Sequence, residues 1–351
     1  MKKSLLALAV LGVFASAASA QSSVTLSGSV DAGLRRVGTA TGHDWRMQGS
    51  QSGYNAFTIA GSEDLGGGMR AFFALNHRFA IQNGTGNGTT YAAGIDPFWR
   101  NTEVGLSGAF GDVRLGRILV PIQVVSGTFD PFLTGTVGTV FTNSIAATAR
   151  ATNTIYYRSP TMGGLSVHAS ISAAEGQNQA GNGTTGLGEI GNPGAQGYFA
   201  RTVDLNRERP MGFNARYTAG PLRLAAGYDR NTAGMKTAGV YGAYNFGVFT
   251  LLGAFEKGDN FTSAAAAALA EDIKTFSLGV TAPFGPVLIR AGYLNIDSDL
   301  VNRDAKKMGF GGDYNLSKRT NLYATVGKWS GNRISVANKK AQFDLGVTHR
   351  F

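Results

Sequence analysis

Short and long connections alternate along the whole chain, and this alternation restricts the possible folds more than any other feature. Seven short turns rich in Gly, Pro, Asp or Asn can each reverse the chain tightly. They begin at Gly61, Ala109, Ser159, Thr218, Asn245, Ala282 and Asn315. Eight longer links lie between them, at 37–53, 80–97, 118–149, 174–209, 231–235, 258–270, 298–304 and 330–339. Fifteen connections of this kind join sixteen strands.

The segments between these connections show an apolar and polar alternation with a period of two. In 24–35 one face carries Val24, Leu26, Val30, Ala32 and Leu34, whereas the other face is mostly hydroxyl or charged. The same alternation recurs in the segments 165–171, 222–229, 275–281 and 340–351. A period of two is typical of strands with one apolar face.

These patterns predict an all-β fold, a 16-stranded antiparallel transmembrane β-barrel. Bacterial outer-membrane barrels have even strand numbers, with short turns at one end and long loops at the other. Sixteen strands also leave a water-filled lumen. A soluble β-sandwich is the alternative, but sandwiches seldom keep a strict alternation of short and long connections, and their strands are usually shorter. After residue 20 no apolar run reaches the roughly eighteen residues of a spanning helix, so a membrane role requires a barrel.

The first twenty residues have the features of a secretory signal peptide. Lys2 and Lys3 supply the charge, 5–13 the apolar core, and Ala18 to Ala20 the small residues of a cleavage site. We therefore expect a signal peptide at 1–20 and a single outer-membrane barrel domain at 21–351. Cleavage would leave 30 Lys and Arg against 22 Asp and Glu, a net charge of +8.

The third long link, residues 118–149, is predicted to be functional. Connections of this length inside a compact domain are usually functional or disordered. This one is too apolar for a solvated tail, because it carries a dense set of large apolar side chains. They are Ile118, Leu119, Val120, Ile122, Val124, Val125, Phe129, Phe132, Leu133 and Phe141. We interpret 118–149 as a constriction loop that folds into the barrel lumen and narrows a water-filled pore.

Several other functions are disfavoured by the residue types present. The chain has no cysteine, and its four histidines lack metal-ligand spacing, so we expect neither a metal nor a cofactor. The basic residues occur singly on alternating faces rather than in a patch, which argues against a nucleic-acid partner. No Ser and His share a recognisable local motif, and the chain is therefore not expected to be an enzyme.

Six motifs together carry a family resemblance. They are VTLSGSVDAGL from Val24, GSEDLGGGMRAFFAL from Gly61, VGLSGAFGDVRLGR from Val104, FDPF from Phe129, RATNTIYYRSP from Arg150, and GVTHRF ending in Phe351. The chain resembles a trimeric general porin of the Gram-negative outer membrane, of the betaproteobacterial, anion-selective branch. The resemblance implies a homotrimer in contact with outer-membrane lipid and lipopolysaccharide, and a terminal Phe351 that serves membrane assembly.

The resemblance also implies a constriction in which acids on the third loop face a cluster of arginines. Arg100 and Arg150 stand where family arginines face the constriction, and Asp130 stands on the loop. The chain departs from the family at Ala56, where an arginine is common. It also has a single acid between 118 and 149, where relatives often carry more, and Glu103 replaces a usual aromatic and is interpreted as facing lipid or a subunit contact.

The alternation of side chains along the strands also puts Arg35 and Arg78 on the lumen side. They therefore join Arg100, Arg150 and Asp130 in the predicted pore constriction. Arg117 is expected to brace the base of the loop. Lys274, Arg290, Lys307 and Lys328 could extend a basic path along the far wall. Arginine stays charged at any physiological pH, and rings of arginine select anions. Each arginine could instead lie at the rim and bind lipopolysaccharide or a loop acid.

The predicted function is a channel for passive diffusion of small hydrophilic solutes, preferring anions. Two alternatives remain at this point. One is a surface adhesin or structural barrel with a blocked lumen, and the other is an outer-membrane barrel hydrolase.

Overall fold

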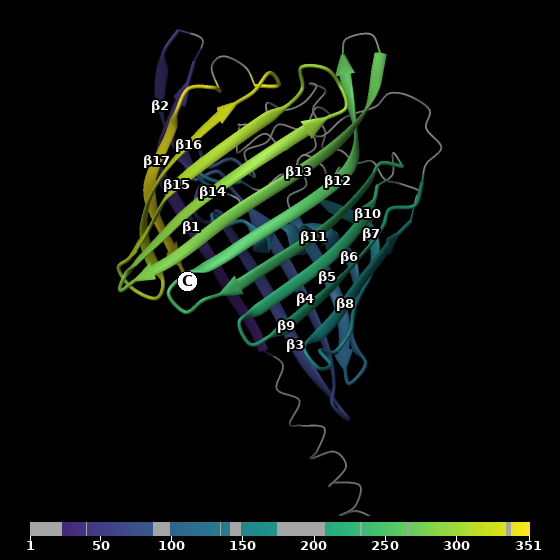
Figure 1. Ribbon diagram of the computed structural model, residues 1–351. Helices are drawn as coiled ribbons and strands as arrows, with labels where there is room; N and C mark the ends of the chain where they lie inside the picture. The colour runs from purple at the N-terminus through teal and green to yellow at the C-terminus, as the bar shows by residue number, and fades with distance from the viewer. Residues whose placement is uncertain are drawn as a thin grey trace, which may run out of the picture.

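The computed structural model describes residues 23–39, 41–86, 99–133, 135–140, 149–173, 208–231, 234–264, 267–334 and 338–351. Within these residues seventeen strands form one antiparallel sheet (Figure 1). The first eight are β1 (Ser23–Gly38), β2 (His43–Gly49), β3 (Ala56–Gly66), β4 (Met69–Arg78), β5 (Trp99–Gly108), β6 (Gly111–Leu119), β7 (Arg150–Arg158) and β8 (Leu165–Ser172). The others are β9 (Met211–Ala219), β10 (Leu222–Arg230), β11 (Lys236–Asn245), β12 (Thr250–Ala264), β13 (Ala267–Phe284), β14 (Val287–Ser298), β15 (Ala305–Asn315), β16 (Thr320–Ser330) and β17 (Gln342–Arg350). The predicted signal peptide lies outside the described residues.

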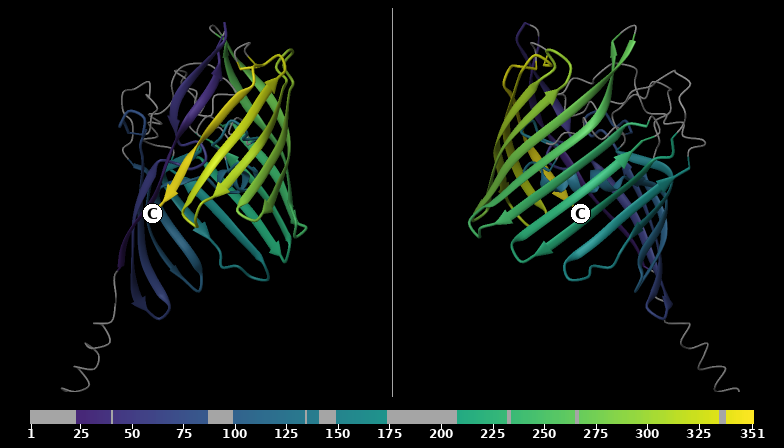
Figure 2. Two further views of the ribbon diagram at one scale, coloured as in Figure 1. Left: turned by 90° about the vertical axis from the view of Figure 1, so that its left-hand side faces the viewer. Right: turned by 45° about the vertical axis from the view of Figure 1, so that its right-hand side comes forward.

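The sheet closes on itself because β1 pairs with both ends of the strand series. From Ser29 to Arg36, β1 pairs with β17, and from Ser23 to Ser29 its other edge pairs with β3. The circuit of β1 and β3 to β17 is a closed barrel of sixteen strands, as predicted. Figure 2 shows the strands running obliquely around this wall. A closed barrel has no free strand edge.

Two predicted links contain more strand than expected. The link 37–53 includes β2, which pairs with β1 between Ala32 and Gly38 and extends the wall above β3. The link 258–270 belongs mostly to β12 and β13, which pair with each other as far as Ala264 and Ala267. Both links are therefore largely hairpins.

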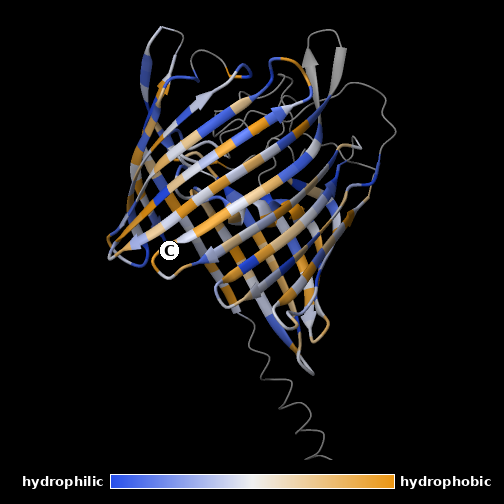
Figure 3. Cartoon of the chain, viewed as in Figure 1, coloured by the Kyte–Doolittle hydropathy of each residue, from blue (hydrophilic) through white to orange (hydrophobic). Residues whose placement is uncertain are grey.

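The polarity of the wall is the reverse of that of a soluble protein. On β17, Leu345 is 48 % exposed, whereas the neighbouring Asp344 is 1 % exposed. Large apolar side chains such as Leu26 and Phe310 are exposed in the same way on other strands. Hydrophobic and hydrophilic residues alternate along the strands of the wall (Figure 3). An apolar outer face and a polar inner face are typical of transmembrane barrels. No helix among the described residues is long and apolar enough to cross a membrane.

The C-terminal residue completes the closure of the barrel. The amide of Phe351 donates to the carbonyl of Gly28 at 3.0 Å, and the amide of Gly28 donates to the carbonyl of Phe351 at 2.9 Å. The Phe351 ring is 44 % exposed. The last residue of the chain is therefore paired to the first strand.

The third long link begins with the helix α2 (Pro121–Ser126) and the 3-10 turn η1 (Gly127–Phe129). A proline at the start of α2 suits the first turn, where its missing N–H costs no hydrogen bond. The helix packs against β8 to β11, and η1 packs against β11 and β12. Ile122 and Phe129 join a buried cluster with Tyr241 and Leu252, and the Phe129 and Tyr241 ring centroids lie 5.4 Å apart. The apolar residues of this link therefore pack against the barrel wall.

One buried carboxylate joins three neighbouring connections at the end of the barrel that carries the long links. Glu271, near the start of β13, accepts hydrogen bonds from Ser298 Oγ at 2.6 Å, Arg303 Nε at 3.2 Å and Arg333 Nη1 at 2.6 Å. Arg333 Nη2 donates to its second oxygen at 3.2 Å. Ser298 is the last residue of β14, Arg303 lies in the link between β14 and β15, and Arg333 lies in the link after β16. Glu271 therefore ties these links to the β12–β13 hairpin.

We expect Glu271→Gln to expose Arg303 and Arg333 to trypsin. Removing one member of a buried ion pair leaves uncompensated charge and costs about 3–5 kcal/mol. Limited trypsin digestion of the folded protein, followed by mass spectrometry, should yield new cleavages after these two arginines. The control is Asp272→Asn, because Asp272 pairs with Lys257 at 3.7 Å where both side chains are more than half exposed. An unchanged digest of the Glu271 variant would contradict the tie.

Candidate functional site

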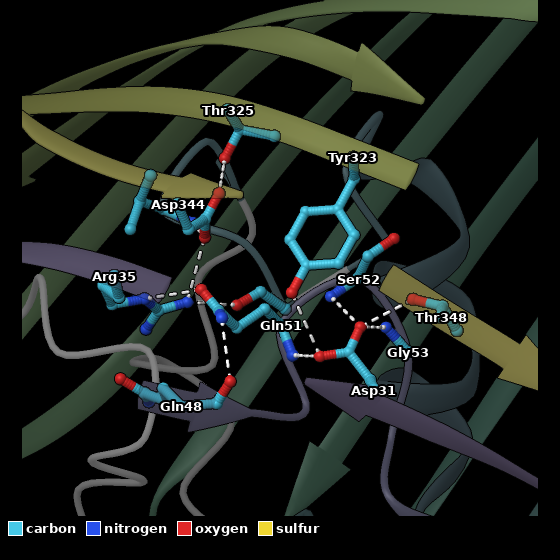
Figure 4. A network of polar contacts seen from close by, with 12 residues as sticks. Asp31, Arg35, Gln48, Gln51, Ser52, Gly53, Tyr323, Thr325, Asp344 and Thr348 are labelled. Carbon is cyan, nitrogen blue, oxygen red and sulfur yellow. Dashed lines mark hydrogen bonds and ion pairs between the residues drawn. The ribbon is translucent and has the colours of Figure 1, made fainter. Parts of the chain in front are cut away.

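A buried ion pair between the first and last strands binds the third link. Arg35 on β1 and Asp344 on β17 are cross-strand neighbours, and Arg35 Nη2 lies 3.1 Å from Asp344 Oδ2. Their side chains are almost fully buried. Arg35 Nη2 also donates to the carbonyl of Gly135 at 3.3 Å, and Asp344 Oδ2 accepts from the amide of Val137 at 2.8 Å. Thr325 Oγ1 donates to the other carboxylate oxygen (Figure 4). The pair therefore binds backbone on both its positive and its negative side.

Two further side chains hold the same segment. Arg290 on β14 pairs with Asp313 on β15, its Nε donating to Asp313 Oδ2 at 2.8 Å, and its Nη1 donates to the carbonyl of Pro131. Asn214 Nδ2 on β9 donates to the carbonyl of Pro121 at 2.6 Å. The described residues between Pro121 and Val137 are thus bound to strands that span more than half of the barrel circumference, from β9 to β1.

The carboxylate of Asp130, the predicted loop acid, accepts hydrogen bonds from other residues of the third link. Its Oδ1 accepts from the amides of Phe132 at 3.1 Å and Val140 at 3.3 Å, and its Oδ2 accepts from Thr139 Oγ1. The residue is 3 % exposed. Asp130 therefore holds Phe132, Thr139 and Val140 close together.

The other predicted constriction arginines lie on β4, β5 and β7. Arg150 Nε donates to Asn101 Oδ1, on the strand that also carries Arg100. Arg100 is buried at a shift in the ladder between β4 and β5. The Arg78 guanidinium lies 3.5 Å from the centroid of the Tyr54 ring. In the closed strand order β5 and β7, which carry Arg100 and Arg150, lie opposite β13 and β15, whereas β4, which carries Arg78, is separated from β1 only by β3.

Arg117 lies at the base of the third link. It pairs with Thr102 on β5, next to an irregularity where the β6–β7 ladder shifts between Gly116 and Ile118. The amide of Val120 donates to the carbonyl of Ala149 at 3.1 Å, so the two ends of the link meet directly above this position.

Sequence reasoning missed the role of Asp31, which organises the return from β2 to β3. Its carboxylate is fully buried and accepts from the amides of Gln51 at 2.8 Å, Ser52 at 3.1 Å and Gly53 at 3.0 Å (Figure 4). Gln51 Oε1 in turn accepts from Arg35 Nε at 3.1 Å. The backbone around Gln51 is therefore part of the same polar network as the third link.

Sequence reasoning also missed Asp344, although the sequence carried a signal for it. Arg35 and Asp344 lie on the polar faces of the first and last strands, and closure makes those strands neighbours. A search for opposite charges on these two faces would have found the pair.

Three sequence interpretations are corrected by the geometry. Glu103 does not face lipid, because its Oε1 lies 3.1 Å from Arg114 Nη1 in an ion pair shielded from solvent. Lys274 and Lys328 do not extend a basic path inside the barrel. Both are on the exposed apolar face, Lys274 two residues before Phe276 and Lys328 opposite Met308. Arg290 and Lys307 lie on the opposite face of the wall from these two lysines.

No group of three or more His, Asp or Glu residues within the described ranges could hold a metal ion. The site is thus a set of cations and carboxylates around a bound segment of backbone.

Comparisons with known proteins agree with this architecture. A family model described as Gram-negative porin matches residues 7–333. Outer membrane porin protein 32 of Delftia acidovorans is 33 % identical over 361 residues, which covers 97 % of this chain and 91 % of the relative. An outer membrane porin protein of Bordetella pertussis is 28 % identical over the full length of both chains. The solved structure of an anion-selective porin from Comamonas acidovorans superposes with a TM-score of 0.74 at 26 % identity, covering 94 % of this chain and all of that one.

Proposed function

The chain belongs to the Gram-negative porin family, and from that premise we propose that it forms an anion-preferring, water-filled pore. It is an outer-membrane channel for passive diffusion and not an enzyme. We further propose where the pore is narrowest and which ions pass through it. Small hydrophilic solutes, anions in particular, are the proposed cargo.

We place the constriction between residues 121–140 and the arginines of β4, β5 and β7. The observation that carries this proposal is the set of bonds from Asn214, Arg290, Arg35 and Asp344 to the backbone of the segment. These bonds hold one side of the proposed constriction against the wall. Arg100 and Arg150 belong to the facing strands and, together with Arg78 on β4, supply its positive side, while Arg117 braces the base of the loop.

Arg35 and Asp130 contribute to the constriction by shaping the segment. Arg35 is compensated by Asp344, and Asp130 is bound by amides and a hydroxyl of its own loop. Of the acids nearby, Asp313 is bound to Arg290 in the same way. We therefore assign the positive field that acts on a passing ion to Arg78, Arg100 and Arg150. Arginine rings in a low-dielectric wall attract anions.

The remaining proposals concern processing and assembly. We propose that residues 1–20 are removed during export and that 21–351 form a single barrel domain. The functional unit is proposed to be a homotrimer, as the family resemblance implies, with Phe351 serving assembly at the barrel seam. The exposed apolar outer wall supports contact with outer-membrane lipid, and its exposed Lys274 and Lys328 suit lipopolysaccharide phosphates.

Planar-bilayer recordings test the channel proposal. We expect purified protein to produce discrete conductance steps and, in a KCl gradient, a reversal potential of the sign set by chloride, because the facing arginines favour anions. A reversal potential set by potassium would refute the electrostatic argument. Well-folded protein without conductance would instead indicate a barrel with a blocked lumen.

A further inference from the structure

Four glycines lie side by side across the inner wall of the barrel. Gly279 on β13 pairs with Gly292 on β14, Gly292 with Gly309 on β15, and Gly309 with Gly327 on β16. Leu252 and Gln342 continue the row on either side and are buried. Four adjacent strands thus have no side chain at the same height.

The third link lies directly against this row. A Cβ at Gly279 would come within 2.7 Å of Pro131 Cδ and Cγ, and one at Gly292 within 2.9 Å of both Val140 methyl groups. At Gly309 a Cβ would overlap the carbonyl oxygen of Gly138, and at Gly327 that of Val137. No side chain larger than hydrogen fits at these positions while Pro131, Val137, Gly138 and Val140 stay in place.

Backbone conformation does not explain the glycines. None of the four has a positive φ, unlike Gly311 on β15 or Gly285 in the turn before β14. Glycine weakens a strand interior because it loses more backbone entropy and packs no side chain. Where the conformation suits any residue, a strand glycine marks a close approach of another backbone.

We infer that Gly279, Gly292, Gly309 and Gly327 form a seat that sets how close the third link lies to the wall, and thereby how wide the channel is. The inference rests on the proposed function, since it assumes that residues 131–140 border the pore. The four glycines act as positioning residues. They touch no solute, but they let the loop backbone lie against the wall where side chains would hold it off.

The polar anchors determine the direction in which a larger residue would push the loop. Arg290 holds Pro131, and Asp344 holds Val137, at the two ends of the stretch on the seat. The wall itself is a continuous hydrogen-bonded sheet behind the glycines. A methyl group added at the seat therefore displaces the loop between its anchors, away from the wall and into the pore.

Alanine substitutions test the seat. We expect Gly309→Ala and Gly292→Ala to lower the single-channel conductance by roughly a quarter or more, because conductance depends on the open cross-section. The control is Gly253→Ala on β12, which pairs with the exposed Leu278 and whose Cβ would meet its nearest heavy atom, Ser277 O, at 3.8 Å. That variant should conduct like the wild type. Heat-modifiable electrophoretic migration should show a folded barrel for each variant.

A second substitution distinguishes loop displacement from general damage. At Gly292 the nearest obstacles are the two Val140 methyl groups at 2.9 Å, and Pro131 Cγ follows at 3.3 Å, so Val140→Ala should restore most of the conductance of the Gly292→Ala variant. At Gly309 the obstacle is a backbone carbonyl, and Val140→Ala should not restore it. If Gly309→Ala fails to fold, the Gly292 and Val140 pair still decides the question.

The possible results distinguish a failure of the proposed seat from a failure of the proposed channel function. Wild-type conductance in both folded alanine variants, with an anion-preferring wild type, overturns the seat and leaves the channel proposal standing. An equal loss of conductance in Gly253→Ala, or a loss in Gly292→Ala that Val140→Ala does not reverse, also overturns it. A folded wild type without conductance overturns the function itself.

Discussion

Replacing Arg100 and Arg150 together by glutamine is expected to lower the anion preference of the channel about fivefold, measured as the chloride to potassium permeability ratio. Two unit charges about 4 Å apart in water interact by about 1 kcal/mol, which corresponds to that factor. The carboxylates on the facing side are already bound by Arg35, Arg290 or the loop amides, so they do not replace the lost field. Reversal potentials in a salt gradient measure the change.

Matched controls for this pair lie on the outer face. Lys274→Gln and Lys328→Gln remove the same number of charges from positions beside the exposed Phe276 and Met308. These variants should keep the wild-type permeability ratio. If they change the ratio as much as the arginine pair does, overall net charge sets the selectivity and the proposed constriction is wrong.

Asp344→Asn is expected to destabilise the folded barrel and release the third link. The substitution leaves the Arg35 guanidinium buried without its carboxylate, for which the cost is about 3–5 kcal/mol. It also gives the Val137 amide a neutral acceptor in place of a charged one, which weakens that hydrogen bond. We expect a lower unfolding temperature in detergent and noisier, more variable conductance steps, since one anchor of the third link is loosened.

The exposed ion pair between Asp44 and Arg46 on β2 provides the comparison. Its atoms lie 3.3 Å apart, but both side chains are more than half exposed, and exposed pairs contribute at most about 1 kcal/mol. Asp44→Asn should leave the unfolding temperature and the conductance steps close to wild type. If Asp344→Asn behaves the same way, the buried pair does not hold the loop.

The barrel could be predicted from sequence because its signals are local. The alternation of Phe343, Leu345 and Val347 with polar neighbours comes from the pleat of a single strand, whose successive side chains point to opposite faces. Turns such as the one from Gly61 need only a few residues that reverse the chain. Repeated sixteen times, these local rules require a closed sheet with an apolar outside.

The direction in which a single side chain points is harder to predict than the strand that carries it, for a reason that concerns register. Phase counting assumes an unbroken alternation, yet the ladders shift beside Arg100 and between Gly116 and Ile118. Such shifts re-aim side chains locally and leave no reliable trace in the alternation. Lys274 and Lys328 are a different case, because the ladders beside them are unbroken and the alternation itself puts Lys274 on the face of Phe276 and Lys328 on that of Val326.

The sequence by itself determined the sixteen strands, the apolar outer face and the presence of a long apolar third link, because each depends on neighbouring residues alone. Only the tertiary structure decided that Arg35 meets Asp344 and that four glycines from different strands align under the loop. Those contacts join residues far apart in the chain, and they exist only when the barrel closes with one particular register between its strands.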